Sequence, residues 1–308
     1  MKYYVRIIKK SGNIYKDNKG NLLNKKKLID EFNKLYIVPI YKDTKFFKNN
    51  EKVYASSIDS KGRTQYSYNQ AFKEEREKKK LKQLRHFLSI QKKLEYKINH
   101  DLNQTQNMKI KNIALILKLM KICNFRIGNE NYEKEYGSIG LTTLKSKHVK
   151  YKKDLTFIEF KGKKGVINTC QFKNKKIQLL LKSLNNKNKY LFSYKDDKYQ
   201  IKHITNNDVN DYLSEFDITN KDIRMANANF LFMYFFNQYI KNINFLNLNE
   251  KEQKKIIKEC AEQVASYLHN TVNVALNSYI SSYLIQNIKK KNLNKNLKTN
   301  QQIKKLIG

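Results

Sequence analysis

The sequence predicts an α+β protein in which a small antiparallel β domain precedes a larger, mainly α-helical domain. Three observations support this prediction. Residues 1 to about 70 form short β-type runs between polar turns, residues 71–99 change to helical spacing, and the pattern from residue 177 to the end is helical. We therefore place the first domain at residues 1–73 and the second at residues 74–308, both of ordinary domain size.

The first domain is expected to contain four strands. They cover residues 3–8, 35–41 around the only proline, 53–58 and 64–68. The helix expected after them, over residues 71–99, has leucine and isoleucine on one stripe and charged residues elsewhere. It is predicted to be amphipathic, with most of its charges in solvent.

The second domain is expected to begin with a buried helix over residues 108–123, because this segment is apolar almost all round. A loop with Arg126 follows it. Further β-type runs cover 138–144, 147–151, 155–160 and 166–172, and the last two are expected to form a hairpin with a lysine at its tip. Helices are predicted over 225–240, over 250–268 and beyond 272. The tail from residue 286 has seven lysines and no acidic residue, which is typical of either a solvated or a DNA-facing helix.

The composition favours a polyanionic partner. Among 308 residues, 63 are Lys or Arg and 27 are Asp or Glu, so the formal net charge is +36. The electrostatic field of such a charge attracts polyanions, and nucleic acid is the first candidate for the partner. An AT-rich coding sequence, which favours Lys, Asn and Ile, is a second explanation for part of this charge. A hydrophobic fraction of 40% is too high for a wholly disordered basic tail.

Several kinds of site have no signature in the sequence. No apolar run reaches the roughly 18 residues of a membrane span, and the first residues lack the apolar core of a signal peptide. Three cysteines, odd in number and far apart, indicate neither a disulfide framework nor a zinc site. The five histidines lack ligand spacing, and no glycine-rich nucleotide loop is present. We expect a reduced, intracellular protein that uses no metal and no small-molecule cofactor.

The scarce residue types indicate where a site lies. Only six of the 63 basic residues are arginine, so an arginine marks a position where a planar, bidentate guanidinium is needed. Six of the nine glycines fall in three short segments, around residues 62, 128–140 and 162–165. Glycine is retained where the backbone turns sharply or a ligand comes close.

Strand transfer on nucleic acid without metal or ATP requires three kinds of group. A nucleophile attacks the phosphodiester, cations neutralise its non-bridging oxygens, and an acid protonates the leaving 5′-oxygen. Tyrosine suits the first task, because a phosphotyrosine conserves the energy needed for resealing. Arginine suits the second, and a lysine among other cations suits the third.

Five ordered motifs resemble the type IB DNA topoisomerases of the poxvirus and bacterial kind, and together they span nearly the whole chain. The separation between Arg126 and Lys163 is also the one that the family shows. The motifs are Asp59-Ser-Lys-Gly-Arg-Thr-Gln-Tyr-Ser-Tyr68, Arg126-Ile-Gly-Asn-Glu-Asn-Tyr132 with Gly137 to His148, Phe160-Lys-Gly-Lys163, Lys221-Asp-Ile-Arg224, and Leu268-His-Asn-Thr271 with Ser278-Tyr279.

The resemblance implies a catalytic set. Arg126 and Arg224 would bind the scissile phosphate, Lys163 would be the general acid, and Tyr279 would form a 3′-phosphotyrosyl intermediate. Nine residues before the nucleophile, poxvirus enzymes have histidine and several bacterial-type relatives have asparagine. Asn270 occupies this position and is the predicted phosphate-oxygen donor. The alternative is His269, about 100° away on a helix.

The resemblance also implies contacts with DNA. Lys61 and Arg63 would bind backbone phosphates, while Gln65, Tyr66 and Tyr68 would reach into the groove. An ordinary strand with packed tyrosines is the alternative for the last three. Further contacts are expected from Tyr132, Lys145 and Lys221. The chain departs from the family at Val272, where relatives usually have proline, and at Met225-Ala226, where an aromatic residue often follows the second arginine motif.

The function implied by the resemblance is relaxation of supercoils. A monomer would clamp double-stranded DNA, nick one strand, allow rotation and religate, without ATP or metal. It would act inside the cell on DNA, in a viral factory, virion, cytoplasm or nucleus. A tyrosine recombinase is one alternative. That family would have histidine at the position of Lys221, and it has no counterpart of the Lys61 to Tyr66 element of this chain. A non-catalytic basic DNA-binding protein is another.

Overall fold

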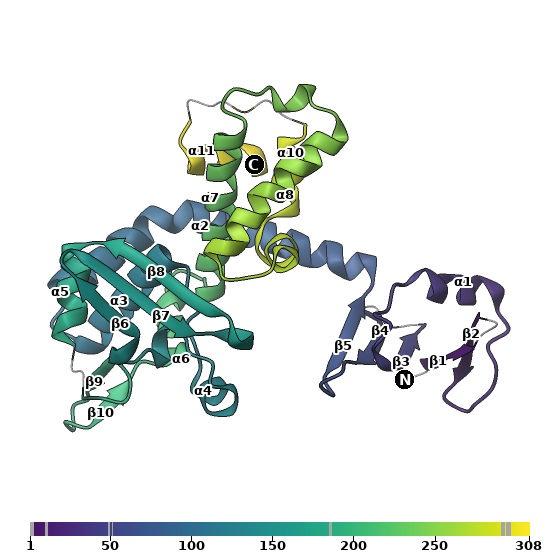
Figure 1. Cartoon of the computed structure of the whole chain (residues 1–308), viewed down its shortest axis with the longest axis horizontal. Coiled ribbons are helices and arrows are strands. Elements are labelled where there is room, and N and C mark those ends of the chain that lie inside the picture. Colours follow the sequence, from purple (N-terminus) through teal and green to yellow (C-terminus); the bar gives the residue numbers. More distant parts are fainter. Residues whose placement is uncertain are drawn as a thin grey trace. The chain divides into compact units, whose positions relative to one another are not determined.

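The structure is a computed structural model, and it describes residues 3–9, 12–48, 50, 52–184, 187–290, 293 and 297–308 (Figure 1). The chain divides into two compact units, Met1–Lys79 and Lys80–Gly308. We describe each unit by itself. The domain boundary that the sequence analysis places after residue 73 stays a prediction. No helix in the described part of the chain is long and apolar enough to cross a lipid bilayer.

Unit 1 contains a five-stranded antiparallel sheet and one short helix. The strand order is β2-β1-β3-β4-β5, with β1 at Tyr3–Lys9, β2 at Gly12–Asp17, β3 at Lys42–Phe47, β4 at Val53–Ile58 and β5 at Thr64–Tyr68. The helix α1, Lys26–Lys34, buries Leu28 and Phe32. The rings of Phe32 and Phe46 lie 4.7 Å apart, in a core shared with Tyr15 and Ala55.

The strands expected over residues 53–58 and 64–68 are confirmed, with the predicted bounds. The strand expected over residues 35–41 is wrong, because that segment connects α1 to β3 without pairing. Pro39 lies within it and has no N–H to donate to a sheet ladder. The sequence analysis missed α1, β2 and β3.

Helix α2, Gln70–Gln104, begins in unit 1 and continues into unit 2. Its start and its amphipathic stripe agree with the sequence prediction, and Leu84, Leu88 and Leu94 are buried on that stripe. The buried helix α3 is confirmed at Met108–Cys123, as predicted from its all-round apolarity.

Unit 2 combines two small antiparallel sheets with helices. One sheet has the order β6-β7-β8, with β6 at Val149–Lys152, β7 at Leu155–Lys161 and β8 at Ile167–Lys173. The other pairs β9, Ser193–Lys195, with β10, Ile201–His203. Figure 1 shows the three-stranded sheet with α3 and α5 at one end of unit 2, and α7, α8, α10 and α11 at the other. The remaining helices are α4 Glu130–Tyr136, α5 Lys175–Ser183, α6 Asn206–Ser214, α7 Asn220–Tyr239, α8 Glu250–Tyr267, α9 Val272–Val274, α10 Ser282–Ile288 and α11 Thr299–Ile307.

Three expectations for unit 2 need correction. Residues 138–144 form no strand; they are irregular and end in a 3₁₀ turn at Leu141–Thr143. The β9–β10 hairpin interrupts the region expected to be wholly helical. The stretch beyond residue 272 is divided into several short helices, and part of the lysine-rich tail lies outside the described residues.

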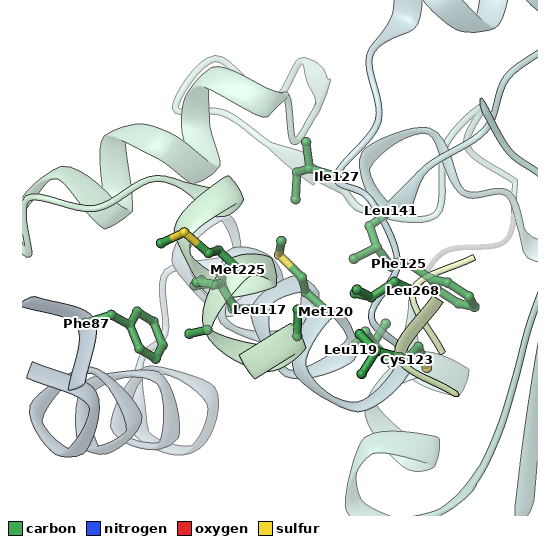
Figure 2. Packing of buried hydrophobic residues seen from close by; sticks show 14 of the residues in the cluster. Phe87, Leu117, Leu119, Met120, Cys123, Phe125, Ile127, Leu141, Met225 and Leu268 are labelled. Carbon is green, nitrogen blue, oxygen red and sulfur yellow. The ribbon is translucent and has the colours of Figure 1, made fainter. Parts of the chain in front are cut away.

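One continuous core supports unit 2 (Figure 2). Leu117 and Met120 come from α3, Met225 from α7, and Leu268 from the end of α8. Phe125 and Leu141, on the loops between these elements, are fully buried in the same cluster. The loops that carry predicted site residues are therefore fixed to the core by their neighbours.

The expectation about cysteines is wrong for two of the three. Cys123 and Cys170 form a disulfide, with their Cα atoms 5.4 Å apart, while Cys260 is free and buried. The two partners are 47 positions apart in the sequence, and they meet because the end of α3 packs against β8. Linear spacing does not reveal such a pair.

Candidate active site

Arg126 lies on the loop that begins at the end of α3. Asn124, the C-terminal cap of α3, has a left-handed backbone with φ of 54°, which ends the helix. The next residue, Phe125, is buried and packs edge-on against Phe160 of β7, with ring centroids 4.7 Å apart. Arg126, half-buried, then donates a hydrogen bond from Nη2 to Oδ1 of Asn270.

Two glycines allow the Arg126 loop to pack closely against residues 138–142. A Cβ atom on Gly140 would lie 2.4 Å from the Cα of Gly128. Gly128 itself has φ of +96°, a backbone conformation that glycine adopts readily. Backbone hydrogen bonds from Leu141 N to Arg126 O, 3.0 Å, and from Thr142 N to Ile127 O, 2.7 Å, hold the two segments together.

Arg224 is a buried charge on the first turns of α7. Its side chain is only 3% exposed, and it donates one hydrogen bond, from Nη2 to the carbonyl of Leu268, at 3.1 Å. No carboxylate pairs with it in the part of the chain that the structure describes. Burial lowers the pKa of Arg224 from 12.5 to about 10, with a smaller raising effect from the Tyr279 phenolate and a smaller lowering effect from Arg126. The guanidinium therefore stays positive at neutral pH.

The turn after α8 directs the side chains of His269 and Asn270 toward different neighbours. His269 has φ of 51° and packs its ring on Phe125, with centroids 5.5 Å apart. Burial, together with the charges of Arg224 and Arg126, lowers the pKa of His269 from 6.5 to about 4. Asn270 faces Arg126 instead. This orientation is the one that the predicted donor role requires of Asn270.

Tyr279 is the last residue of a single π-helical turn, Ala275–Tyr279. The carbonyl of Tyr279 accepts a hydrogen bond from Nδ2 of Asn229, at 3.0 Å. Oδ1 of Asn229 accepts one from the N–H of Ser281, at 2.9 Å. One fully buried amide thus holds the chain on both sides of Ile280 and fixes the turn on which the tyrosine lies. The sequence analysis missed Asn229, a polar residue inside an apolar helix.

The surroundings of Tyr279 favour its ionised form. The Cζ atom of Arg224 lies 5.3 Å from the centroid of the Tyr279 ring. Burial raises the pKa of Tyr279, but the charges of Arg224 and Arg126 and the nearby N–H groups of Arg224 and Asn270 outweigh it. The net pKa is below the ordinary value of 10. A phenol in this position is a better nucleophile than one in water.

Three buried nitrogen donors beside Tyr279 point to an anionic ligand. Nε and Nη1 of Arg224 and Nδ2 of Asn270 have no hydrogen-bond partner among the described residues. Buried donors without partners are rare in folded proteins, because each costs about 1–3 kcal/mol. A phosphodiester has the oxygen atoms and the negative charge that these donors lack.

Lys163 lies on the turn between β7 and β8. Its side chain is exposed, and no ion pair or hydrogen bond holds it within the described part of unit 2. The backbone of this turn is fixed to residues 138–139, through Ile139 N to Lys161 O at 2.9 Å and Ser138 Oγ to Gly162 O at 3.3 Å. The structure brings Arg126, Arg224, Asn270 and Tyr279 together, whereas Lys163 lies on a neighbouring element with its ammonium in solvent.

In unit 1, the carboxylate of Asp59 organises the predicted DNA-binding turn. It accepts hydrogen bonds from the backbone N–H of Lys61 at 2.9 Å and from Nε and Nη2 of Arg63 at 2.9 and 2.7 Å. Nε2 of Gln65 donates to the same carboxylate at 3.0 Å. The Arg63 hydrogen bonds hold the pKa of Asp59 well below its usual value. Arg63 remains more than half exposed in this pair.

Tyr66 and Tyr68 belong to a row of neighbouring aromatic rings in unit 1. Tyr66 is 54% exposed, and its ring lies 6.4 Å from that of Tyr68. Tyr68 packs on Phe72 at 5.1 Å, and the guanidinium of Arg76 lies 5.4 Å above the Tyr68 ring. Tyr66 is therefore open to a ligand, while packing restricts Tyr68.

The other three predicted DNA contacts lie on two helices and a loop of unit 2. Tyr132 is 60% exposed on α4, and Lys221 is exposed on the first turn of α7. Lys145 forms an ion pair with Glu133 of α4 at 2.5 Å. Glu133 also accepts a hydrogen bond from the Tyr190 hydroxyl. Lys145 thus anchors the helix that presents Tyr132.

Comparisons with known proteins show the family of the chain. The family model of the eukaryotic DNA topoisomerase I catalytic core matches residues 69–306. The chain belongs to this family. A DNA topoisomerase 1B of Acanthamoeba polyphaga mimivirus is 30% identical over 276 residues, which cover 86% of this chain and 81% of the relative. The DNA topoisomerase 1B of vaccinia virus, strain Copenhagen, is 25% identical over 238 residues, or 76% of this chain and 72% of the relative.

A solved structure of the XerH site-specific recombinase, bound to its difH substrate before cleavage, also matches part of the chain. Its TM-score is 0.35 and its identity 16%, over 68% of this chain and 52% of that chain.

Proposed function

We propose that this protein relaxes supercoiled double-stranded DNA as a type IB topoisomerase. Membership of the DNA topoisomerase I family supports this function. The observation that carries it is the group of unpartnered, buried donors on Arg224 and Asn270 beside a tyrosine of lowered pKa. This arrangement suits attack by a phenolate on a phosphodiester whose charge the donors neutralise.

In the proposed reaction, the Tyr279 oxygen attacks the scissile phosphorus and the 5′-oxygen leaves. Arg126, Arg224 and Asn270 bind the non-bridging oxygens, and Lys163 gives its proton to the leaving oxygen. Strand rotation follows, and the 5′-hydroxyl then attacks the 3′-phosphotyrosine to reseal the strand. The chain acts as a monomer that clamps DNA, inside a cell, and the clamp includes Lys61, Arg63, Gln65, Tyr66 and Tyr68 of unit 1 and Tyr132, Lys145 and Lys221 of unit 2.

The test is relaxation of a supercoiled plasmid by the pure protein in EDTA. We expect complete relaxation by the wild type, a covalent protein–DNA adduct after denaturant trapping, and neither with Tyr279→Phe. Exchange of strands between two duplexes, in place of relaxation, would identify a recombinase. Binding without an adduct would identify a non-catalytic DNA-binding protein.

The role of Lys163 has its own test. Lys163→Ala should slow cleavage of an ordinary duplex by roughly 100-fold to 10,000-fold, the range for loss of a general acid. Replacing the leaving 5′-oxygen by sulfur should restore most of the rate, because a thiolate leaves without a proton. Lys164→Ala, a change at the adjacent exposed lysine, is the matched control and should stay within about threefold of the wild type. No rescue by sulfur would remove Lys163 from the acid role.

A further inference from the structure

The disulfide joins the two segments that carry Arg126 and Lys163. Cys123 is the last residue of α3, three positions before Arg126. Cys170 lies in β8, the strand that leads back from the Lys163 turn. Their Cα separation of 5.4 Å lies in the usual range for a disulfide. The bond therefore links the segment of Arg126, the proposed phosphate ligand, to the hairpin of Lys163, the proposed general acid.

The edge strand β8 benefits more from such an anchor than the central strand β7 does. It lies at the edge of the β6-β7-β8 sheet, so only β7 pairs with its backbone. Edge strands have unpaired N–H and C=O groups on one side and are held less firmly than central ones. Before Cys170 in the chain, the residues of the turn and the start of β8, 163–167, are exposed. The disulfide fixes the middle of this edge strand to the buried end of α3.

The remaining links between the two segments are non-covalent. They include the edge-on contact of Phe125 with Phe160 and the hydrogen bonds from residues 138–139 to the backbone of Lys161 and Gly162. These links reach β7 or the start of the turn, whereas β8 is held by its ladder with β7 and by Phe172, which packs against the core. Because Cys170 lies on the other side of the turn, the disulfide restrains the hairpin from its second strand.

We propose that the Cys123–Cys170 disulfide is a positioning cross-link that holds the Lys163 hairpin against the Arg126 segment during strand cleavage. This inference rests on the proposed function. Reduction leaves Arg126 and Tyr279 in place, since both are tied to the core by other contacts, but it removes the covalent restraint on β8, which keeps only its ladder with β7 and the packing of its side chains. The reduced protein therefore donates the proton to the leaving oxygen less efficiently, and the rate of cleavage responds to the thiol redox state.

The bond can form by exchange with a small-molecule disulfide. Cys170 is partly exposed and Cys123 is only 4% exposed, so the Cys170 thiolate attacks first. This attack forms a mixed disulfide and releases one small thiol. The Cys123 thiolate then attacks the Cys170 sulfur and releases the second. Two protein thiols are oxidised, one external disulfide is reduced to two thiols, and the two cysteine protons end on the released thiols.

The experiment measures single-turnover cleavage by the full chain, oxidised with glutathione disulfide or reduced with dithiothreitol. Each form is tested on two duplexes that differ only in the leaving atom, oxygen or sulfur. Reduction should slow cleavage of the oxygen substrate about tenfold, a part of the 100-fold to 10,000-fold effect of a general acid. Cleavage of the sulfur substrate should change less than about twofold, because its leaving group needs no acid.

Three variants serve as controls. Cys123→Ser and Cys170→Ser should cleave the oxygen substrate at the reduced rate under both conditions. Cys260→Ala removes the free, buried cysteine and should keep the full redox response. Melting curves of each protein confirm that it is folded at the assay temperature.

The outcomes separate a positioning role from a structural one. Equal slowing of both substrates on reduction would mean that the disulfide only supports the fold, and it would overturn the proposal. Alkylation of both Cys123 and Cys170 in the oxidised protein, detected by mass spectrometry, would overturn it too. If the oxidised wild type forms no adduct with either substrate, the proposed function itself fails, and this inference fails with it.

Discussion

At the scale of single residues, the candidate active site holds positive charge that has no acidic partner among the described residues. Arg224 is almost fully buried, yet its only hydrogen bond among the described residues goes to a backbone carbonyl. Taking a guanidinium out of water costs several kcal/mol unless a partner compensates it. The fold tolerates this cost because packing around α7 supports the side chain. The charge then acts on Tyr279 and on any anion that enters.

The lowered pKa of Tyr279 predicts how cleavage depends on pH. The phenolate is the attacking form, so the single-turnover rate should rise tenfold per pH unit and level off below pH 10. Arg224→Ala removes the main charge that lowers this pKa, and the rise should move to higher pH. Arg6→Ala, a loss of guanidinium in unit 1, should leave the midpoint unchanged. An unchanged midpoint in Arg224→Ala would contradict the assignment.

His269 predicts how stability depends on pH. Its folded pKa of about 4 lies below the unfolded value of 6.5, so the unfolded state binds more protons between these values. Stability from the neutral ring is therefore fully present above pH 6.5 and is lost as the pH falls toward 4. After allowance for the partly exposed ring, the loss should be about 2 kcal/mol.

The variant for this test is His269→Asn, because asparagine tolerates the positive φ at this position. Urea unfolding at pH 7.5 and pH 4.5 should show a smaller drop for the variant than for the wild type. Equal drops in the two proteins would mean that His269 is not responsible for the acid sensitivity.

At the scale of elements, the site depends on two backbone segments that pass within contact distance. Gly140→Ala would place a Cβ atom 2.4 Å from Gly128, so the Arg126 loop must move. We expect a loss of about 3 kcal/mol in the free energy of unfolding, at the upper end for overpacking. Cleavage should fall at least tenfold, because a displaced Arg126 no longer meets the phosphate.

The matched control for this substitution is Gly137→Ala. Gly137, unlike Gly140, has positive φ, but nothing lies within 4 Å of an added Cβ atom. Its cost should be about 1 kcal/mol, from backbone strain alone, with little change in cleavage. Similar effects of the two variants on cleavage would show that close packing against Gly128 does not position Arg126.

Elements with strong periodicity could be predicted from the sequence, whereas contacts that depend on packing could not. The all-round apolarity of 108–123 gave the bounds of α3, and alternation gave β4 and β5. The strand prediction for 35–41 was wrong because the apolar residues there surround Pro39, which has no N–H to donate to a neighbouring strand. The Cys123–Cys170 bond depends on how α3 meets β8, which no spacing encodes. One sequence signal could have pointed to Asn229, because an amide inside an apolar helix is expected to be buried and then requires hydrogen-bond partners.

At the scale of the whole molecule, the net charge of +36 and the chemistry of the site belong to different residues. Lysines on the surface supply most of the charge, and they can bind phosphates anywhere along a duplex. Arg126, Arg224 and Asn270 are partly or fully buried, and they act on a single phosphate in the proposed reaction. Affinity and catalysis should therefore respond differently to salt, because screening weakens exposed charges far more than buried ones.

This difference can be measured with the cleavage-defective Tyr279→Phe protein and a duplex that contains the cleavage site. Its affinity should fall at least about 1,000-fold between 50 and 200 mM salt, as for proteins that release many counterions. The wild-type cleavage rate, measured at saturating protein at each salt concentration, should change less than about threefold. Arg224→Ala should alter the slope of log affinity against log salt by no more than about one unit, since it removes one phosphate contact. A weak salt dependence of binding would mean that the surface lysines reflect base composition and not contact with DNA.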